Sequence, residues 1–565
     1  MTNTLTLSSR FVLATLLAAV GLYSFFWLVR WSPIYWLSES SMTRALAILV
    51  SIGVAMAALT YKARVRTFRP PVGRSYWIAY GALLACAAII TSLVALDNFP
   101  TSADEYAYLF QARTFEAGRL WNDPKPLGQA LSVTYAWAIG NRWVGQYPPF
   151  WPAVLAVFDV ITPSVRLANA LTIAATGFAV AYVVQRRAGR SAAWLAAGLF
   201  ALCPFTIFNG ASLMSHPMAA ALGLAALVAS LLSVERRSLW WSAVAGVAIG
   251  LLGMTRFVSA PVFLIVVLLD IARAERRIAR LIAFGLGGLP SAAVLAVYQK
   301  AITGSPLHPA YWISGRTDDH LYFDYHSIVS SVSHTIRYIV ELHLWTSPFL
   351  LMLWIASIIY LFRLRTLRPI DLAFPLGIVL FCFYPLNAGI RFGPRYYFDF
   401  WPCAVITIGS ALRTLPWRYR PIFRRGILLS MCFGLASTLI ICVEWHRVSW
   451  DREEVYRLAT TAKLQNAVLC MDKDSGTMLP LTDRDFPRNG FRDDAPVLYV
   501  RCARTISPMV NALPWKRRMA PISIDTAKAA YPSRSVWTYT RKDGSTHGEL
   551  VLLSLPLTAG NKVGM

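Results

Sequence analysis

Long apolar runs alternate with short polar segments along most of this chain. Each run has roughly 17–22 residues, enough for a helix to cross a hydrocarbon core of ~30 Å. The first run follows Arg10, keeps bulky residues to its end and has no small-x-small cleavage site, so we interpret it as a retained anchor. We predict about thirteen membrane-spanning helices, near residues 11–29, 44–60, 76–96, 166–184, 191–208, 217–234, 239–254, 257–272, 281–299, 347–362, 372–388, 396–412 and 426–443.

The composition agrees with this pattern. Hydrophobic residues make up 56% of the 565 positions, and the mean hydropathy is +0.49, which is far above the values of soluble enzymes. The net charge of +25 does not indicate a nucleic-acid partner, because the basic residues do not form a stripe with interleaved aromatics. They are concentrated in every second loop between apolar runs, as in multi-pass membrane proteins.

The basic loops predict the topology. Under the positive-inside rule they are cytoplasmic, which puts the amino terminus inside and the carboxyl terminus outside. This arrangement requires Phe150–Ile161 not to span the membrane, and at about 12 residues it is too short to do so. It fits a re-entrant or interfacial helix. The basic loops lie at 61–75, 185–190, 273–280, 363–368 and 413–425.

The topology divides the chain into three parts. Residues 1–75 form a two-helix membrane extension, 76–443 a transmembrane module with outer loops at 97–165 and 300–346, and 444–565 a domain outside the membrane. We therefore expect an all-α polytopic membrane protein with a small carboxyl-terminal α/β domain. Four strand-like segments are predicted in that domain, at Ala467–Met471, Val497–Arg501, Val536–Thr540 and Leu550–Leu553.

Two of the eight cysteines differ from the rest. Six lie in apolar runs, where cysteine behaves as a small hydrophobic residue. Cys470 and Cys502 lie at the ends of predicted strands in the exported domain, where an oxidising compartment could join them. The sequence gives no geometry, so both a disulfide and two free thiols remain open.

Two adjacent carboxylates follow the apolar run at 76–96. Ser102-Ala103-Asp104-Glu105 matches a capping box and predicts a helix that ends near Gly118. In one interpretation Asp104 complements the helix dipole and Glu105 bonds back to the cap. In the other interpretation, this helix and the short helix at Phe150–Ile161 line a cavity in which the carboxylates take part in catalysis.

Three further positions on the outer face could meet that cavity. Arg395 begins a predicted span, where its planar guanidinium could pair with phosphate or only anchor the helix end. Arg256 lies in a very short outer hairpin, against the positive-inside bias. His216, at the end of another span, is a structural residue or a ligand.

Four motifs together resemble a known family, the C-type (GT-C) polyprenyl-phosphate-dependent glycosyltransferases. This superfamily includes bacterial relatives of protein O-mannosyltransferases and the lipid A aminoarabinose transferase. The resemblance covers about residues 80–445 and implies a multi-helix membrane fold, an active site on the non-cytoplasmic face and inversion at the sugar carbon. Its motifs are Asp104-Glu105-Tyr106, Tyr147-Pro148-Pro149, Arg166-Leu167-Ala168-Asn169-Ala170 and Gly393-Pro394-Arg395-Tyr396.

The resemblance also implies roles for residues. Asp104 would accept the proton of a hydroxyl acceptor, and Glu105 would orient the loop or the acceptor. Arg395 and Arg256 would bind the donor phosphate. Residues that could line the substrate site are Tyr106, Tyr147, His216 and Tyr396.

The chain departs from the family pattern at two places. Aminoarabinose transferases usually carry Glu-Lys before the Pro-Pro pair, where this chain has Gln146-Tyr147. Protein O-mannosyltransferases tend to carry an acid where this chain has Ser215-His216. Neither subfamily's acceptor can therefore be transferred to this protein.

The expected partners are a lipid-linked sugar donor, membrane lipids, and a glycan, lipid or protein acceptor, in a bacterial inner membrane. The reaction that the resemblance implies needs no nucleotide, which agrees with the absence of a glycine-rich phosphate loop from the sequence. Asp318, Asp319 and His320 are a weak metal signal. We expect no obligatory cofactor and leave a divalent cation open. Two other functions are weighed: a transporter or flippase for a lipid-linked substrate, and a non-catalytic assembly scaffold.

Overall fold

The computed structural model describes most of the chain. The described residues are 73–124, 127, 130–131, 133, 135–311, 328–383, 391–417, 419–472, 489, 495–502, 522–540 and 548–555. The predicted spans at 11–29 and 44–60 lie outside them, as do Asp318, Asp319 and His320.

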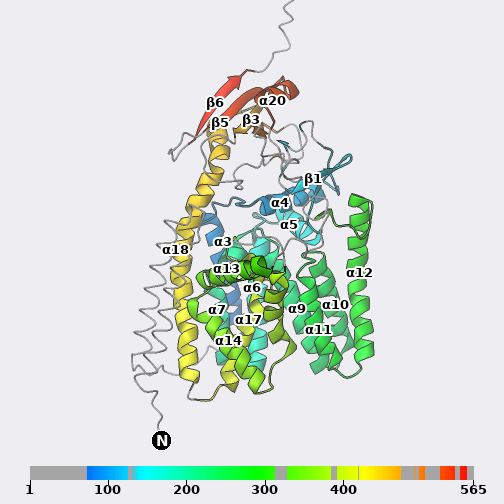
Figure 1. Cartoon of the computed structure of the whole chain (residues 1–565), viewed down its shortest axis with the longest axis vertical. Coiled ribbons are helices and arrows are strands. Elements are labelled where there is room, and N and C mark those ends of the chain that lie inside the picture. Colours follow the sequence, from blue (N-terminus) through cyan, green and yellow to red (C-terminus); the bar gives the residue numbers. More distant parts are fainter. Residues whose placement is uncertain are drawn as a thin grey trace, which may run out of the picture.

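Helices form the body of the molecule (Figure 1). Within the part of the chain that the structure describes, five are long and apolar enough to cross a membrane. The number is six if the bent pair α7 (Arg190–Ala201) and α8 (Pro204–Ala211), which meet at 59°, forms one broken span. The chain is a multi-pass membrane protein. The five long helices are α3 (Arg74–Val94), α6 (Leu167–Ala188), α9 (His216–Glu235), α12 (Arg277–Thr303) and α18 (Arg420–Thr461).

Among the described residues the remaining predicted spans are shorter helices, so the number thirteen stays a prediction. The segment Phe150–Ile161, predicted to be too short to span, is helix α5 with those same bounds. The other short elements are α10 (Leu239–Gly253), α11 (Ala260–Ala272), α14 (Pro348–Arg363), η4 (Pro369–Leu372), α15 (Ala373–Cys382), α16 (Arg395–Phe398) and α17 (Trp401–Thr414).

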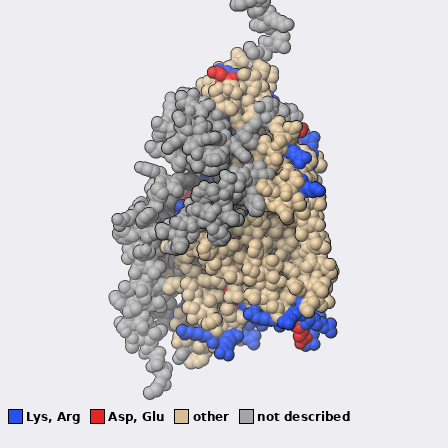
Figure 2. Space-filling model, turned by 45° about the vertical axis from the view of Figure 1, so that its right-hand side comes forward, with Lys and Arg blue, Asp and Glu red and all other residues tan. Residues whose placement is uncertain are grey.

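Basic side chains gather at the end of the bundle that is farther from the sheet domain (Figure 2). At that end Arg187 forms a two-pronged ion pair with the fully buried Asp371, with distances of 2.8 and 2.7 Å. Thr407 on α17 donates a third hydrogen bond to the same carboxylate, at 2.9 Å. The buried charge is therefore compensated, and it fixes α6 against α17.

The carboxyl-terminal domain is a four-stranded sheet reached by α18, which runs 42 residues from the basic end of the bundle (Figure 1). All four predicted strands are confirmed. The strand order is β4-β3-β5-β6, with only the β5–β6 pair antiparallel. Helix α20 (Ile524–Ala530) packs on the sheet. The strands are β3 (Ala467–Asp472), β4 (Val497–Cys502), β5 (Ser535–Thr540) and β6 (Glu549–Ser554).

A disulfide joins Cys470 to Cys502 on the neighbouring parallel strands β3 and β4. Both residues are buried in a small core with Leu498 and Val500, and Leu131 of the first outer loop completes that core. The sheet domain therefore packs directly on the outer loop.

The outer loops contain more regular structure than the sequence analysis predicted. The expected helix after Ser102 is α4 (Ala103–Glu116). A hairpin of β1 (Ala136–Ile139) and β2 (Arg142–Gly145) follows and was not predicted. The second outer loop includes an unpredicted helix, α13 (Ile328–Trp345). Its polar residues interrupt the apolar pattern on which the span predictions relied.

Candidate active site

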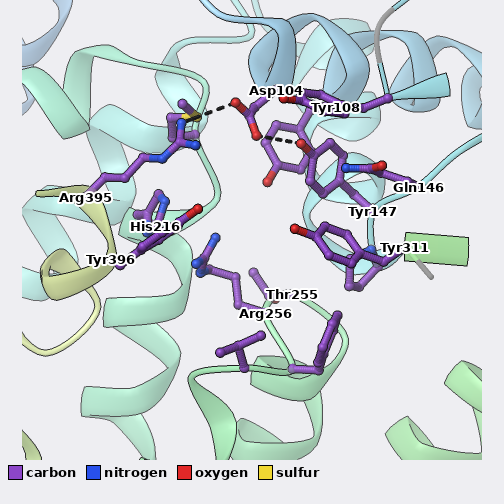
Figure 3. A pocket seen from close by; sticks show the side chains of 15 residues that line it. Asp104, Tyr108, Gln146, Tyr147, His216, Thr255, Arg256, Tyr311, Arg395 and Tyr396 are labelled. Carbon is purple, nitrogen blue, oxygen red and sulfur yellow. Dashed lines mark hydrogen bonds and ion pairs between the residues drawn. The ribbon is translucent and has the colours of Figure 1, made fainter. Parts of the chain in front are cut away.

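A cavity opens between α4, the segment after β2, and the amino-terminal ends of α9, α11 and α16 (Figure 3). Its lining combines aromatic, polar and charged side chains: Asp104, Tyr108, Tyr135, Gln146, Tyr147, Pro148, Met214, His216, Thr255, Arg256, Phe257, Val258, Tyr311, Arg395 and Tyr396.

Residues that are far apart in the sequence meet here as the motif analysis predicted. Six of the eight predicted catalytic, phosphate-binding and substrate-lining residues line this one cavity: Asp104, Tyr147, His216, Arg256, Arg395 and Tyr396. Glu105 and Tyr106 are not part of its lining. Their absence follows from helix geometry, because successive residues on a helix are turned by about 100°.

Asp104 projects from the first turn of α4 into the cavity. The Tyr147 hydroxyl donates a 2.5 Å hydrogen bond to its Oδ1, and Arg395 Nη1 lies 3.2 Å from its Oδ2 (Figure 3). Burial by itself raises the pKa of this carboxyl. The charges of Arg395 and Arg391 and the Tyr147 hydrogen bond outweigh burial and hold the pKa below its usual range. Asp104 is therefore ionised at neutral pH.

Glu105 points into the protein instead. It completes the predicted capping box with Ser102. Its side chain is fully buried, and its Oε1 accepts a 2.8 Å bond from the backbone N–H of Leu213. The amide and hydroxyl groups of Thr101 and Ser102 donate to Oε2 at 3.0–3.2 Å. Glu105 therefore holds the start of α4 to the turn between α8 and α9.

Two further groups of hydrogen bonds fix the same region. Arg391 and Arg452 both donate to the carbonyl of Thr101, three residues before Asp104. In the motif at 166–170, Asn169 donates to the carbonyls of Ser212 and Met214 at 2.7 and 2.9 Å. These contacts leave Asp104 on a well-defined backbone.

Asp399 organises the opposite wall of the cavity. Its Oδ1 lies 2.8 Å from His216 Nδ1, and its Oδ2 accepts from Arg256 Nε at 2.9 Å and from the Ser259 hydroxyl. Asp399 itself is fully buried. This carboxylate therefore directs an imidazole and a guanidinium toward the cavity, a role that the sequence analysis did not predict.

The two arginines approach the same aromatic ring. The guanidinium carbons of Arg256 and Arg395 lie 5.7 and 5.5 Å from the centre of the Tyr396 ring, within cation–π range. Two planar guanidinium groups near one ring are an arrangement that could bind an anionic group.

Aromatic residues close the side nearest α4. Tyr147 contacts Tyr108 and Tyr135, with ring centres 4.3 and 6.1 Å apart. Gln146, in the position of a family glutamate, accepts a 2.8 Å bond from the Trp137 indole. Sequence reasoning missed Tyr108 and Tyr135. Tyr108 could have been predicted, because it lies four residues after Asp104 and therefore on the same face of the helix.

No family model and no curated protein matches this chain. Solved structures do. The apo structure of ArnT from Cupriavidus metallidurans superimposes with a TM-score of 0.50 at 14% identity, over 82% of this chain and 93% of ArnT. Its structure bound to undecaprenyl phosphate gives 0.51 at 14% identity, over 83% and 93%. The chain has the GT-C fold.

The GT-C fold confirms the architecture that the four motifs implied. The oligosaccharyltransferase AglB from Archaeoglobus fulgidus also matches, with a TM-score of 0.43 at 12% identity over 74% of this chain and 64% of AglB. The match to ArnT covers more of the chain than residues 80–445, which carry the motifs.

Proposed function

We propose that this protein is a membrane glycosyltransferase that moves a sugar from a polyprenyl-phosphate donor to a hydroxyl acceptor. One observation carries the proposal: the ionised Asp104 and the guanidinium groups of Arg256 and Arg395 line the same cavity. The likeness to ArnT, which was solved bound to undecaprenyl phosphate, supports a lipid phosphate as the carrier. The acceptor is a cell-envelope glycan, lipid or protein.

In the proposed reaction the acceptor hydroxyl attacks the anomeric carbon from the face opposite the phosphate, so the configuration inverts. The bond between that carbon and the phosphate oxygen breaks, and the oxygen keeps the electron pair. The hydroxyl proton passes to Asp104. General-base help of this kind typically contributes about 10²–10⁴-fold in rate.

The leaving polyprenyl phosphate gains negative charge as the bond breaks. Arg256 and Arg395 stabilise that charge, and Asp399 keeps Arg256 oriented before the reaction begins. His216, Tyr147 and Tyr396 bind the sugar or the phosphate from the walls. The reaction needs no nucleotide and no obligatory cofactor.

The test is transfer of radiolabelled sugar from undecaprenyl-phosphate sugar in membranes that contain each variant. Asp104→Asn is expected to lower transfer by about 10²–10⁴-fold. Asp123→Asn, on an exposed residue of the same outer loop, is the matched control and should transfer at the wild-type rate. Unchanged transfer by Asp104→Asn refutes the assignment. Movement of the labelled lipid between leaflets without a new glycosidic bond would instead identify a flippase.

The reaction is proposed to occur on the periplasmic face of a bacterial inner membrane. The basic loops at one end of the bundle support this orientation. Reporter fusions after residue 70 and after residue 450 should report opposite sides of the membrane. Signals from the same side would contradict the topology.

A further inference from the structure

The proposed base and a proposed phosphate ligand are already bonded to each other. Arg395 Nη1 lies 3.2 Å from Asp104 Oδ2, and the pair bridges two walls of the cavity (Figure 3). The side chain of Arg395 is 7% exposed and that of Asp104 is 21% exposed. The ion pair is therefore poorly solvated. A ligand that competes for either partner must offset the attraction between the two charges.

The atoms of Arg395 that can reach a ligand are restricted. A guanidinium binds phosphate bidentately along one edge, either Nη1 with Nη2 or Nε with Nη2. Among the described residues nothing bonds to Arg395 Nε, which is buried. Because Nε is buried, we expect a phosphate to approach along the Nη1–Nη2 edge, which includes the nitrogen that Asp104 holds.

Asp104 depends on the same contact. Its Oδ1 accepts the Tyr147 hydroxyl and its Oδ2 faces Arg395, so both oxygens have partners. A carboxylate that is hydrogen-bonded and paired in this way is a weak base, because both contacts favour its ionised form.

We propose that the donor phosphate and Asp104 share Arg395, so that donor binding loosens the ion pair and turns Asp104 into a stronger base. This inference rests on the proposed function and adds an order to it: the donor binds first and prepares the residue that takes the proton of the acceptor. Coupling between two ligands of one group is reciprocal, so Asp104 must weaken phosphate binding by the same factor.

The effect of Arg395 on the pKa of Asp104 therefore depends on whether a phosphate is bound. Its charge holds the pKa of Asp104 below the usual range. When a phosphate compensates that charge, the pKa of Asp104 rises toward its ordinary value. A second cation that acts on Asp104 is Arg391, whose Nη1 donates to the Thr101 carbonyl. It stays in place in this scheme.

The test is a double-mutant cycle on binding of undecaprenyl phosphate, the sugar-free product, to the purified full-length protein. Asp104→Asn should bind about tenfold more tightly than wild type, because Arg395 is no longer shared. In an Arg395→Gln background the same change should alter the Kd less than about twofold. Asp123→Asn removes an exposed carboxylate of the same outer loop without freeing Arg395, and should stay within about threefold of wild type.

Equal or weaker binding by Asp104→Asn would overturn the inference. A gain that persists in the Arg395→Gln background would also overturn it, because that gain would be general charge repulsion. Asp104→Ala provides a second variant, since the prediction depends on losing the carboxylate and not on the asparagine amide. If the wild-type protein does not bind undecaprenyl phosphate at all, the proposed function fails as well.

Discussion

Oε1 of Glu105 accepts a 2.8 Å hydrogen bond from the backbone N–H of Leu213, 108 residues further along the chain. The neighbouring Asp104 faces the cavity, so adjacent carboxylates on one helix have opposite surroundings. Glu105 has five hydrogen bonds from protein groups, all to a side chain without solvent exposure. Its contribution is to the position of α4.

Glu105→Gln should therefore lower stability more than it lowers chemistry. Glutamine replaces one accepting oxygen with an N–H₂ group that faces donors, which leaves buried groups unsatisfied at a cost of about 1–3 kcal/mol. We expect a lower midpoint of thermal unfolding in detergent, with transfer per folded molecule reduced less than about tenfold. Asp104→Asn should show the opposite balance, because its loss of transfer should far exceed the loss of stability that follows from breaking its ion pair with Arg395.

Glu235→Gln is the control for that comparison. Glu235 pairs with Arg186 at the surface, where solvent screening leaves such a pair with little effect on stability. Its unfolding midpoint should match wild type. If Glu105→Gln unfolds like wild type but transfers no sugar, Glu105 acts in the chemistry and the positioning role is wrong.

A second prediction concerns Asp399. Asp399→Asn leaves the Arg256 guanidinium without its carboxylate, and breaking a buried ion pair by removing one partner costs about 3–5 kcal/mol. The midpoint of unfolding should fall, and the KM for the lipid donor should rise because Arg256 and His216 lose their orientation. Thermal unfolding and donor titrations measure the two effects.

Ser259→Ala removes only one of the hydrogen bonds to the same carboxylate. It should cost about 1 kcal/mol and leave the donor KM within about threefold of wild type. An Asp399→Asn variant with an unchanged KM would mean that Arg256 does not bind the donor.

A third prediction is the pH dependence of transfer. The folded-state pKa of Asp104 is depressed, so its ion pair stabilises the fold above the unfolded pKa of about 3.9 and loses that effect as pH falls through the folded pKa. The acid limb of kcat/KM should therefore lie below about pH 4. In Arg395→Gln the limb should move to higher pH, because the main cation that favours the ionised carboxylate is gone.

The donor does not obscure this limb, since a phosphodiester keeps a single negative charge across the range. Arg186→Gln, an exposed arginine at the basic end of the bundle, is the control and should leave the limb in place. A limb near pH 6 that is the same in wild type and Arg395→Gln would assign the proton acceptor to a histidine.

The sequence predicted the parts of the molecule that depend on local pattern. Hydrophobic run length located the helices, and the capping box located the start of α4. Period-two segments located all four strands of the outer domain. Resemblance to a family then selected Asp104 and Arg395, and in the structure Arg395 Nη1 lies 3.2 Å from Asp104 Oδ2.

The missed features depend on which way side chains point after packing. Glu105 and Tyr106 were grouped with Asp104 because they are adjacent, yet a helix turns them away from the cavity. Asp399 lies on the far wall, and only the fold brings it to Arg256 and His216. The β1–β2 hairpin has four-residue strands and a turn at Gly140-Asn141, which is too short a pattern to stand out in a 69-residue loop at 97–165.

The last prediction concerns the disulfide between Cys470 and Cys502. The two residues are 32 apart, and closing a loop of that length stabilises a domain by about 3–4 kcal/mol in the chain-entropy model. The disulfide core includes Leu131, which belongs to the same outer loop as the cavity residue Tyr135. Replacing both cysteines with alanine should therefore make the sheet domain more sensitive to protease and also lower transfer. Replacing Cys86, an exposed residue on α3, is the control and should change neither. Increased proteolysis with unchanged transfer would show that the sheet domain does not position the outer loop.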